Sequence, residues 1–331
     1  MMQKDGSSTA AAATPVAHAR GPRIELPCLK WIRAALIGLS FVLINACTGS
    51  GAASTVESQD PIDGNQAQDM QEIAPGDEIL VVGATGSVGR LVVADALDAG
   101  YRVRALVRDR ARAERLLPSQ ATLVVGDLTD PASLPALVGG IDGIVFTHGA
   151  SGETAAREVN YGGVRNILFA LDERPVRVAM MSAVGVTRPI DPDRRSSEPR
   201  GWKRRGERLL RASGMPYTIV RPGWFDYNAE DQQRMVFRQG DTEQTGTPQD
   251  GVIARRQIAN VLVASLSSAT ANRKTLELVA ERGSEQSDLD PLFAALEADA
   301  DGALDGPRDQ PNLPLSEEPE VFREDLRQIK R

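Results

Sequence analysis

The sequence predicts an α/β fold built on a doubly wound parallel sheet of about seven strands, with a C-terminal appendage. From Glu78 onward, short β-branched runs alternate with amphipathic stretches, which is typical of parallel strands joined by helices. The runs are apolar almost without interruption, as expected of strands that are covered on both faces. The first run leads directly into a glycine-rich turn, which is typical of a nucleotide-binding sheet.

The expected strands and helices alternate along the chain from residue 78 to about residue 283. The apolar runs predict strands at 78–82, 102–107, 122–125, 143–146, 176–181, 217–221 and 275–279. The amphipathic stretches between them predict helices at 87–99, 111–117, 131–138, 154–172, 203–212 and 256–266. Asp130 and Pro131 support one of these helix starts, because an aspartate caps a helix and a proline fits its first turn.

The composition excludes several classes of function. Hydrophobic residues make up 41% of the 331 residues and charged residues 25%, which is ordinary for a globular chain that buries a core. The net charge of −7 argues against a nucleic-acid partner, since surfaces that bind DNA or RNA are basic. The two cysteines, Cys28 and Cys47, and the two histidines, His18 and His148, are too few for a metal cluster, so no metal is expected.

The first 75 residues differ from the rest. An apolar run at 34–44, preceded by basic residues, would span about 16 Å as a helix, which is half a membrane and the length of a signal-peptide core. The residues before Cys47 resemble a bacterial lipoprotein box, so 1–47 is predicted to be a signal and membrane-anchor region with Cys47 lipidated. The polar stretch 48–75 is predicted to be a flexible linker. The alternative is a cytoplasmic protein whose apolar run has no role in export.

The first predicted strand leads into a loop that predicts dinucleotide binding. Residues 83–90 read Gly-Ala-Thr-Gly-Ser-Val-Gly-Arg. Glycines let the chain turn tightly, let the backbone approach a pyrophosphate and let the helix pack on its strand, while the helix N-terminus offers free N–H groups to phosphate. A Rossmann domain is therefore expected over 76–283. Its predicted cofactor-binding residues in this loop are Gly83, Thr85, Gly86, Ser87, Val88 and Gly89.

The end of the second strand bears on the choice of coenzyme. NAD sites place an acid there for the ribose 2′-hydroxyl, whereas this chain has Arg108, whose guanidinium suits the 2′-phosphate of NADP. NADP(H) is therefore favoured over NAD(H), with Arg110 as a further contact. Asp109 would take the acid's role if the register differed by one residue. Asp127 and Leu128 follow the third strand and are also predicted to contact the cofactor, with Asp127 facing the adenine.

Several segments resemble the atypical short-chain dehydrogenase/reductase superfamily, in particular its NmrA-like, NAD(P)H-binding branch. The resemblance covers about residues 80–260 in the family's order, and it is specific for the fold rather than for a substrate. The matching segments are GATGSVGR at 83–90, LVRD at 106–109, GDLTD at 126–130, VNYGGVRNIL at 159–168, MSAVGV at 181–186, WKRRGERLLRASGMPYTIVRPG at 202–223 and a stretch that contains Arg255.

The resemblance implies a reductase site from which one member is missing. Short-chain reductases use a serine to orient the substrate carbonyl, a tyrosine to give it a proton, and a lysine to hold the ribose and lower the tyrosine's pKa. By position, Ser182 matches the serine and Lys203 the lysine, but Pro199 stands at the tyrosine and has no proton to give. Glu207, one helical turn after Lys203, is expected to pair with it. The candidates for the missing acid are His148, Tyr161, Tyr227 and Ser182 itself.

Three further features of the sequence complete the prediction. Trp224, Phe225 and Tyr227 follow a strand at the sheet edge where open α/β sheets bind ligands, so together with His148 they are predicted to line a substrate pocket. The arginines that surround Lys203 are interpreted as a solvated helix face. The remainder, 284–331, is an acidic tail in which one amphipathic piece, 289–296, is expected to pack on the domain.

Two functions are consistent with these features. One is an NADP-dependent oxidoreductase that transfers hydride to a small molecule, with Ser182 and Lys203 as its catalytic residues. The alternative is a non-catalytic NADP(H)-binding sensor or scaffold, which Pro199 favours. Lipidation of Cys47 would place the domain outside the cytoplasm, where free NADP(H) is scarce, so the lipoprotein prediction conflicts with the reductase prediction.

Overall fold

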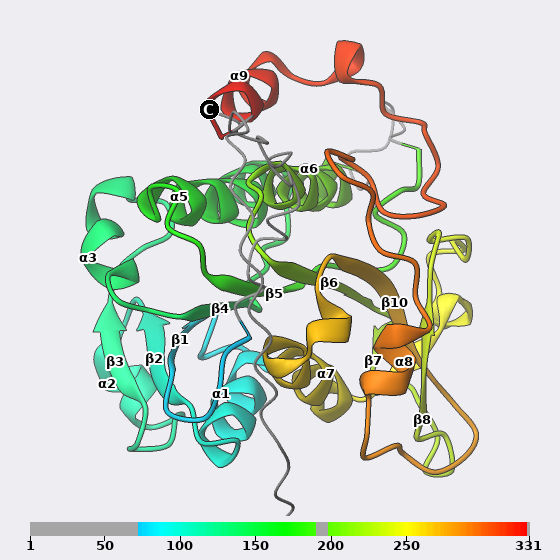
Figure 1. Cartoon of the computed structure of the whole chain (residues 1–331), viewed down its shortest axis with the longest axis horizontal. Helices are drawn as coiled ribbons and strands as arrows, with labels where there is room; N and C mark the ends of the chain where they lie inside the picture. Colours follow the sequence, from blue (N-terminus) through cyan, green and yellow to red (C-terminus); the bar gives the residue numbers. More distant parts are fainter. Residues whose placement is uncertain (1–71, 190–197, 330–331) are drawn as a thin grey trace, which may run out of the picture. The chain divides into compact units, whose positions relative to one another are not determined.

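The computed structural model describes residues 72–189 and 198–329. An eight-stranded sheet in the order β3-β2-β1-β4-β5-β6-β10-β8 lies at the centre of this part of the chain (Figure 1). The strand order reverses between β1 and β4, as in other doubly wound sheets, so the α/β prediction is confirmed. The strands are β1 (Glu78–Val82), β2 (Arg102–Val107), β3 (Thr122–Val125), β4 (Gly143–Phe146), β5 (Arg177–Met181), β6 (Tyr217–Pro222), β8 (Arg234–Arg238) and β10 (Lys274–Glu281).

The prediction of about seven parallel strands missed β8, which runs antiparallel to β10 at the edge of the sheet. Its sequence, Arg-Met-Val-Phe-Arg, carries a charged residue at each end and buries only Met235 completely, so it lacks the apolar run of an inner strand. An edge strand with one open side tolerates such a sequence. Two short strands, β7 (Trp224–Phe225) and β9 (Val252–Ile253), pair with each other in a separate sheet and were also not predicted.

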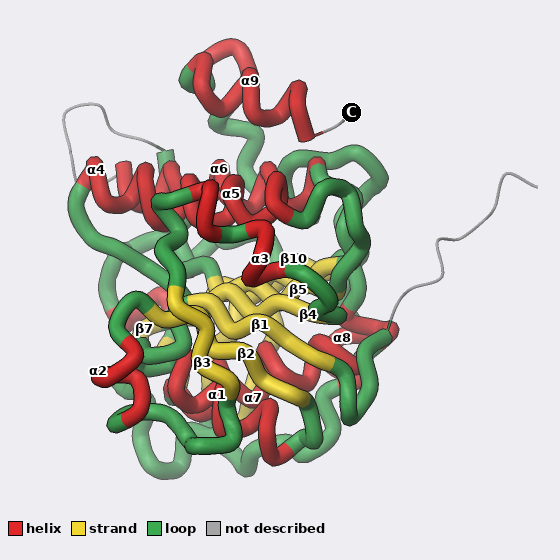
Figure 2. The backbone as a smooth tube through the Cα atoms, turned by 90° about the vertical axis from the view of Figure 1, so that its left-hand side faces the viewer, coloured by secondary structure: helices red, strands yellow, loops and turns green. Residues whose placement is uncertain are grey.

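Helices cover both faces of the sheet. Figures 1 and 2 show α1 and α7 on one face and α3, α5 and α6 on the other, with α9 outside α5 and α6. Each face has its own buried apolar core. No helix within the described residues is long and apolar enough to cross a membrane. The helices are α1 (Gly89–Asp98), α2 (Arg110–Glu114), α3 (Pro135–Val138), α4 (Glu153–Ala155), α5 (Gly162–Ala170), α6 (Glu198–Ala212), α7 (Arg255–Ser267), α8 (Asp290–Ala294) and α9 (Glu320–Ile329).

Two predicted helices are divided in the structure, and two others have different bounds: the helix predicted at 203–212 begins earlier, at Glu198, and the one predicted at 111–117 ends earlier, at Glu114. The helix predicted at 131–138 is divided into a 3₁₀ turn, Pro131–Ser133, and α3. Pro135 explains the division, because proline has no N–H and its ring clashes with the preceding turn. The helix predicted at 154–172 consists of α4, a π-helical stretch and α5 in succession. The predicted signal region with Cys47, and nearly all of the predicted linker, lie outside the described residues.

The C-terminal segment packs on the domain through α8 and α9. In α8 the fully buried ring of Phe293 lies 5.0 Å, between centroids, from the ring of Phe237 in β8. In α9 the buried Phe322 packs 6.0 Å from Tyr161, and Leu326 joins the same core. The segment therefore contributes to the cores on both faces of the sheet.

We expect Phe322→Ala to lower the free energy of unfolding by about 3 kcal/mol, because it removes a fully buried ring and leaves a cavity. Denaturant unfolding of the full chain measures this loss. The neighbouring Val321→Ala is the matched control, since Val321 is exposed and its truncation should cost less than about 0.5 kcal/mol. Equal losses in the two variants would show that α9 does not hold the core as described.

Candidate functional site

The glycine-rich loop is packed so closely that side chains are excluded from it. Gly83 has a φ of +85°, and a Cβ there would lie 2.7 Å from the backbone nitrogen of His148. A Cβ on Gly89 would lie 2.2 Å from the carbonyl oxygen of Gly83. The N–H of Gly86 donates to that same carbonyl at 2.9 Å, which closes the turn before α1. These glycines bring the ends of β1 and β4 and the start of α1 together.

A cavity of about 570 Å³ opens at this loop, along the carboxyl ends of the first strands. Its volume falls in the range of ordinary cofactor and ligand sites. The predicted residues that line it are Gly83, Thr85, Gly86, Ser87, Val88, Arg108, Asp127, Leu128, His148 and Phe225. Gly89 lies behind the loop rather than on the cavity wall. Further lining residues, which sequence reasoning did not single out, are Leu106, Val107, Gly126, Thr147, Gly149, Ala150, Ala155, Val159 and Met181.

At one end of the cavity Arg108 lies near Asp127. Hydrogen bonds from the backbone and hydroxyl of Thr129, and to a lesser degree the charge of Arg108, lower the pKa of Asp127, so its carboxylate is ionised. Asp109 does not line the cavity, because its side chain caps α2 by accepting from the N–H of Arg112. Arg110 is also held elsewhere, since its guanidinium donates to the carbonyl of Leu123 at 2.9 Å.

Further along the cavity, His148 follows β4, and the charge of Lys203 from α6 acts on it. The two predicted catalytic residues, Lys203 and Ser182, are not among the residues that line the cavity. Burial, together with the charge of Lys203, lowers the pKa of His148 to about 3, so the imidazole is neutral near pH 7. Its Nδ1 is buried without a hydrogen-bond partner. Burial lowers the pKa of Lys203 to about 8, although the charge of Glu207 opposes the change. A lysine of this kind still carries a proton at pH 7 but releases it more readily than an exposed lysine.

Glu207 does not form the predicted simple pair with Lys203. Its two carboxylate oxygens accept from Arg221 at 3.1 and 2.7 Å, and one of them also accepts from Arg211 at 3.3 Å. Although burial alone would raise the pKa of Glu207, attraction from these arginines lowers it to about 2. The buried Ser182 hydroxyl makes no hydrogen bond of standard geometry, but it lies close enough to Glu207 to help lower that pKa.

Of the three aromatic residues predicted to line the pocket, the structure places one on the cavity wall. Phe225 lines the cavity, whereas Trp224 and the largely exposed Tyr227 do not, and their rings meet edge to face. Arg255 lies over the Phe225 ring and donates from Nε to the Ser87 hydroxyl at 3.1 Å. It thereby joins the glycine-rich loop to the segment after β6. The sequence signal for this arginine was its place at the start of a late helix.

Two other groups bear on the chemistry of the site. Tyr161, a candidate for the missing acid, donates its hydroxyl to Asp325 of α9 at 2.6 Å, and burial with this bond raises its pKa. It is therefore a structural contact with the C-terminal segment rather than a cavity residue. Within the described ranges, no group of three or more His, Cys, Asp or Glu side chains is placed to hold a metal ion.

The fold and the cavity define a nucleotide-binding protein of the Rossmann class, and comparison with known proteins specifies it further. A family described as NAD(P)H-binding matches residues 83–269. The chain belongs to this NAD(P)H-binding family, which is related to the atypical short-chain dehydrogenases/reductases. The chain is thus an NAD(P)-binding protein of an oxidoreductase family that includes NAD(P)H-dependent reductases.

The chain is similar over part of its length to two curated proteins. It is 29% identical over 235 residues to the chloroplastic protein TIC 62 of Oryza sativa subsp. japonica, with 62% of this chain and 46% of that protein covered. It is 30% identical over 191 residues to an NAD(P)H azoreductase of Xenophilus azovorans, with 57% and 63% covered. The chain therefore spans less than two thirds of either relative. The solved structure of the oxidoreductase ylbE from Lactococcus lactis shares the fold, with a TM-score of 0.54, 16% identity and 67% and 100% coverage.

We expect Gly89→Ala to destabilise the protein by about 1–3 kcal/mol, because the added methyl meets the Gly83 carbonyl and forces the loop away from α1. The same displacement should weaken NADPH binding, as measured by calorimetry. Gly149→Ala is the matched control, since Gly149 lines the same cavity but has open space at its Cβ. Equal thermal unfolding of Gly89→Ala and wild type would contradict the packing described.

Proposed function

We propose that this protein is an NADP(H)-dependent oxidoreductase of the atypical short-chain type that acts on a small molecule. One observation carries the proposal: a single cavity joins the glycine-rich loop and Arg108 to His148, a residue on which the charge of Lys203 acts. The residues present fit a dinucleotide, because Gly83 and Gly86 line the cavity at the start of α1 without side chains, and the buried Nδ1 of His148 has no hydrogen-bond partner among the described residues. The activity named for the similar azoreductase supports reduction as the class of reaction.

The preference for NADP(H) rests on Arg108. Arg108 lines the cavity just after β2, where Rossmann domains contact the ribose that bears the 2′-phosphate. The competing acid, Asp109, is used as the cap of α2. A guanidinium beside a phosphate forms charge-assisted hydrogen bonds that the 2′-hydroxyl of NAD cannot match.

Arg108→Ala should therefore raise the Kd for NADPH at least about tenfold, the loss expected for a hydrogen bond to a charged group, and leave the Kd for NADH nearly unchanged. Fluorescence titration with each coenzyme measures both constants. Arg110→Ala is the control, because Arg110 is bonded to the Leu123 carbonyl and should not affect either. Equal weakening of NADPH and NADH by Arg108→Ala would argue against 2′-phosphate recognition.

The residues of this chain bind the coenzyme and the substrate and supply the proton that the substrate receives. When bound, the coenzyme supplies the hydride. With Pro199 at the position of the usual tyrosine, we assign the proton to Lys203 Nζ, since its pKa of about 8 suits a general acid near neutral pH. The neutral His148 offers Nδ1 to the ligand. Ser182 directly follows the cavity residue Met181, and we assign its hydroxyl to the orientation of the substrate carbonyl.

If Lys203 is the acid, kcat/KM falls as pH rises through about 8, by about tenfold for each further unit, because only the protonated amine donates. Lys203→Met should reduce turnover by about 10²- to 10⁴-fold and remove this dependence. Lys203→Arg is the control for charge: it should retain more NADPH affinity than Lys203→Met without restoring the pH profile. A wild-type profile that is flat from pH 6 to 10 would exclude this assignment.

The substitution at Pro199 also supports a second function, a non-catalytic NADP(H) sensor or scaffold. Assays of NADPH oxidation with a panel of quinones, flavins and aldehydes distinguish the two. Turnover with any of these classes supports the oxidoreductase, whereas tight NADPH binding without turnover across the panel supports the sensor.

A further inference from the structure

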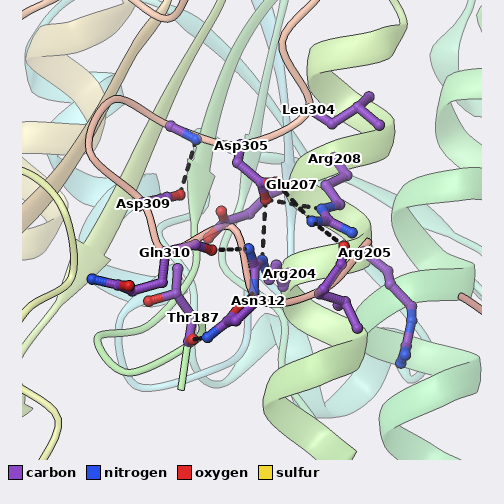
Figure 3. A network of polar contacts seen from close by, with 12 residues as sticks. Thr187, Arg204, Arg205, Glu207, Arg208, Leu304, Asp305, Asp309, Gln310 and Asn312 are labelled. Atoms are coloured by element: carbon purple, nitrogen blue, oxygen red, sulfur yellow. Dashed lines mark hydrogen bonds and ion pairs between the residues drawn. The ribbon is translucent and has the colours of Figure 1, made fainter. Parts of the chain in front are cut away.

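The basic face of α6 is buried, which corrects the prediction of a solvated surface. Arg204, Arg205, Arg208 and Arg211 are only 1%, 4%, 3% and 6% exposed. The C-terminal segment runs across this face, and Figure 3 shows its carboxylates and backbone carbonyls directed at the guanidinium groups. A charge that is buried to this degree is costly unless it is paired, so the contacts of the segment are required by the burial of α6.

Most of these contacts form an outer layer of ion pairs. Asp305 accepts from Arg204 at 3.1 Å and from Arg208 at 2.9 and 2.7 Å. Glu318 accepts from Arg205 and from Arg208, each at 2.6 Å. This layer fixes the C-terminal segment to α6, and none of the residues named in it lines the cavity.

Asp309 belongs to a second, inner chain of contacts that leads toward the candidate site. Both of its carboxylate oxygens accept from Arg221 at 2.7 Å. The same guanidinium donates to both oxygens of Glu207, at 3.1 and 2.7 Å, and to Glu277 at 3.1 Å. Asp309, Arg221 and Glu207 are all buried at their side chains. A single guanidinium is therefore shared between the C-terminal segment and α6.

Glu207 in turn faces the site residues. It lies one helical turn after Lys203, on the spacing at which helical side chains interact, and it is close to the Ser182 hydroxyl. Among the described residues, the titratable groups coupled electrostatically to Lys203 are Glu207 from its own helix and His148 after β4. Because His148 is neutral, Glu207 supplies the negative charge beside the lysine.

We propose that Asp309 is a positioning residue for the candidate site: through Arg221 it holds Glu207 in place and balances its charge beside Lys203 and Ser182. The proposal deepens the proposed function and rests on it for the role of Lys203. Loss of the Asp309 charge leaves Arg221 with fewer buried carboxylates. Its positive charge then neutralises more of Glu207, and Lys203 loses its proton at lower pH.

The test follows the titration of Lys203 in the full chain by the pH dependence of its acetylation, read by mass spectrometry of its peptide. The sequence has few lysines, and Lys274 serves as the reference inside each sample. In Asp309→Asn the midpoint for Lys203 should fall by about half a unit or more, so that its labelling at pH 7 rises about threefold. Asp305→Asn is the matched control, because Asp305 pairs with α6 but does not contact Arg221.

A paired variant covers the case in which Asp309→Asn does not fold. Arg221→Met with Asp309→Leu removes both buried charges together, which proteins often tolerate. Glu207 then keeps only Arg211 as its arginine partner, so its negative charge acts more strongly on Lys203 and the midpoint should rise. Opposite shifts in the single and paired variants are the signature of a positioning role. A general loosening of the segment would move both in the same direction.

The proposal is overturned if a folded Asp309→Asn or paired variant keeps the wild-type midpoint, or if Asp305→Asn shifts it equally. Asp309→Glu, which restores the charge, should restore the wild-type titration. The labelling needs neither coenzyme nor turnover. A protein that binds NADPH but reduces nothing would therefore refute the oxidoreductase while leaving this result intact, and an unchanged midpoint in an active enzyme would refute only the role of Asp309.

Discussion

A buried positive charge must be paired with a negative one, and this constraint joins the C-terminal segment to the rest of the domain. Helix α6 and strand β6 together present five arginines that are nearly closed to solvent, and much of their counter-charge comes from residues after 298. Leaving one member of a buried ion pair alone costs about 3–5 kcal/mol. The region that matches the NAD(P)H-binding family, 83–269, therefore depends on the segment that follows it. We infer that the two fold together.

The parts of the fold that depend on local sequence could be predicted closely. Inner strands such as β1 and β4 are short apolar runs covered on both faces, and their bounds match the prediction because the run ends where the burial of the strand ends. The glycine-rich loop could also be predicted from the sequence, since a Cβ at each of its glycines would meet backbone atoms. The strand β8 was not predicted, because a strand at the edge of a sheet does not need a continuous apolar run.

The candidate site was predictable only in part, because some of the residues that pair with each other around it lie far apart in the sequence. Arg108 directly follows β2 and His148 lies two residues after β4, so the sheet order brings them to one edge. The arginines of α6 looked like a solvated stripe, and their carboxylates lie about a hundred residues later in the chain. Periodicity describes one helix at a time and does not say what covers it. The sequence signal for this pairing was the presence of a basic helix and, later in the same chain, an acidic segment.

Because Pro199 stands where other short-chain reductases have a tyrosine, the proton donor is identified from the electrostatic surroundings of the remaining candidates. Tyr161 is committed to α9, and Tyr227 lies largely in solvent, away from the cavity wall. His148 is neutral near pH 7 and carries no acidic imidazolium proton, because burial and a neighbouring positive charge both disfavour its charged form. Lys203 differs because a buried carboxylate one turn away partly offsets its desolvation and keeps it charged at pH 7. That carboxylate shares the Arg221 guanidinium with Asp309. We propose that this contact of the C-terminal segment, and not the outer ion pairs to α6, acts on the group on which the proposed reaction depends.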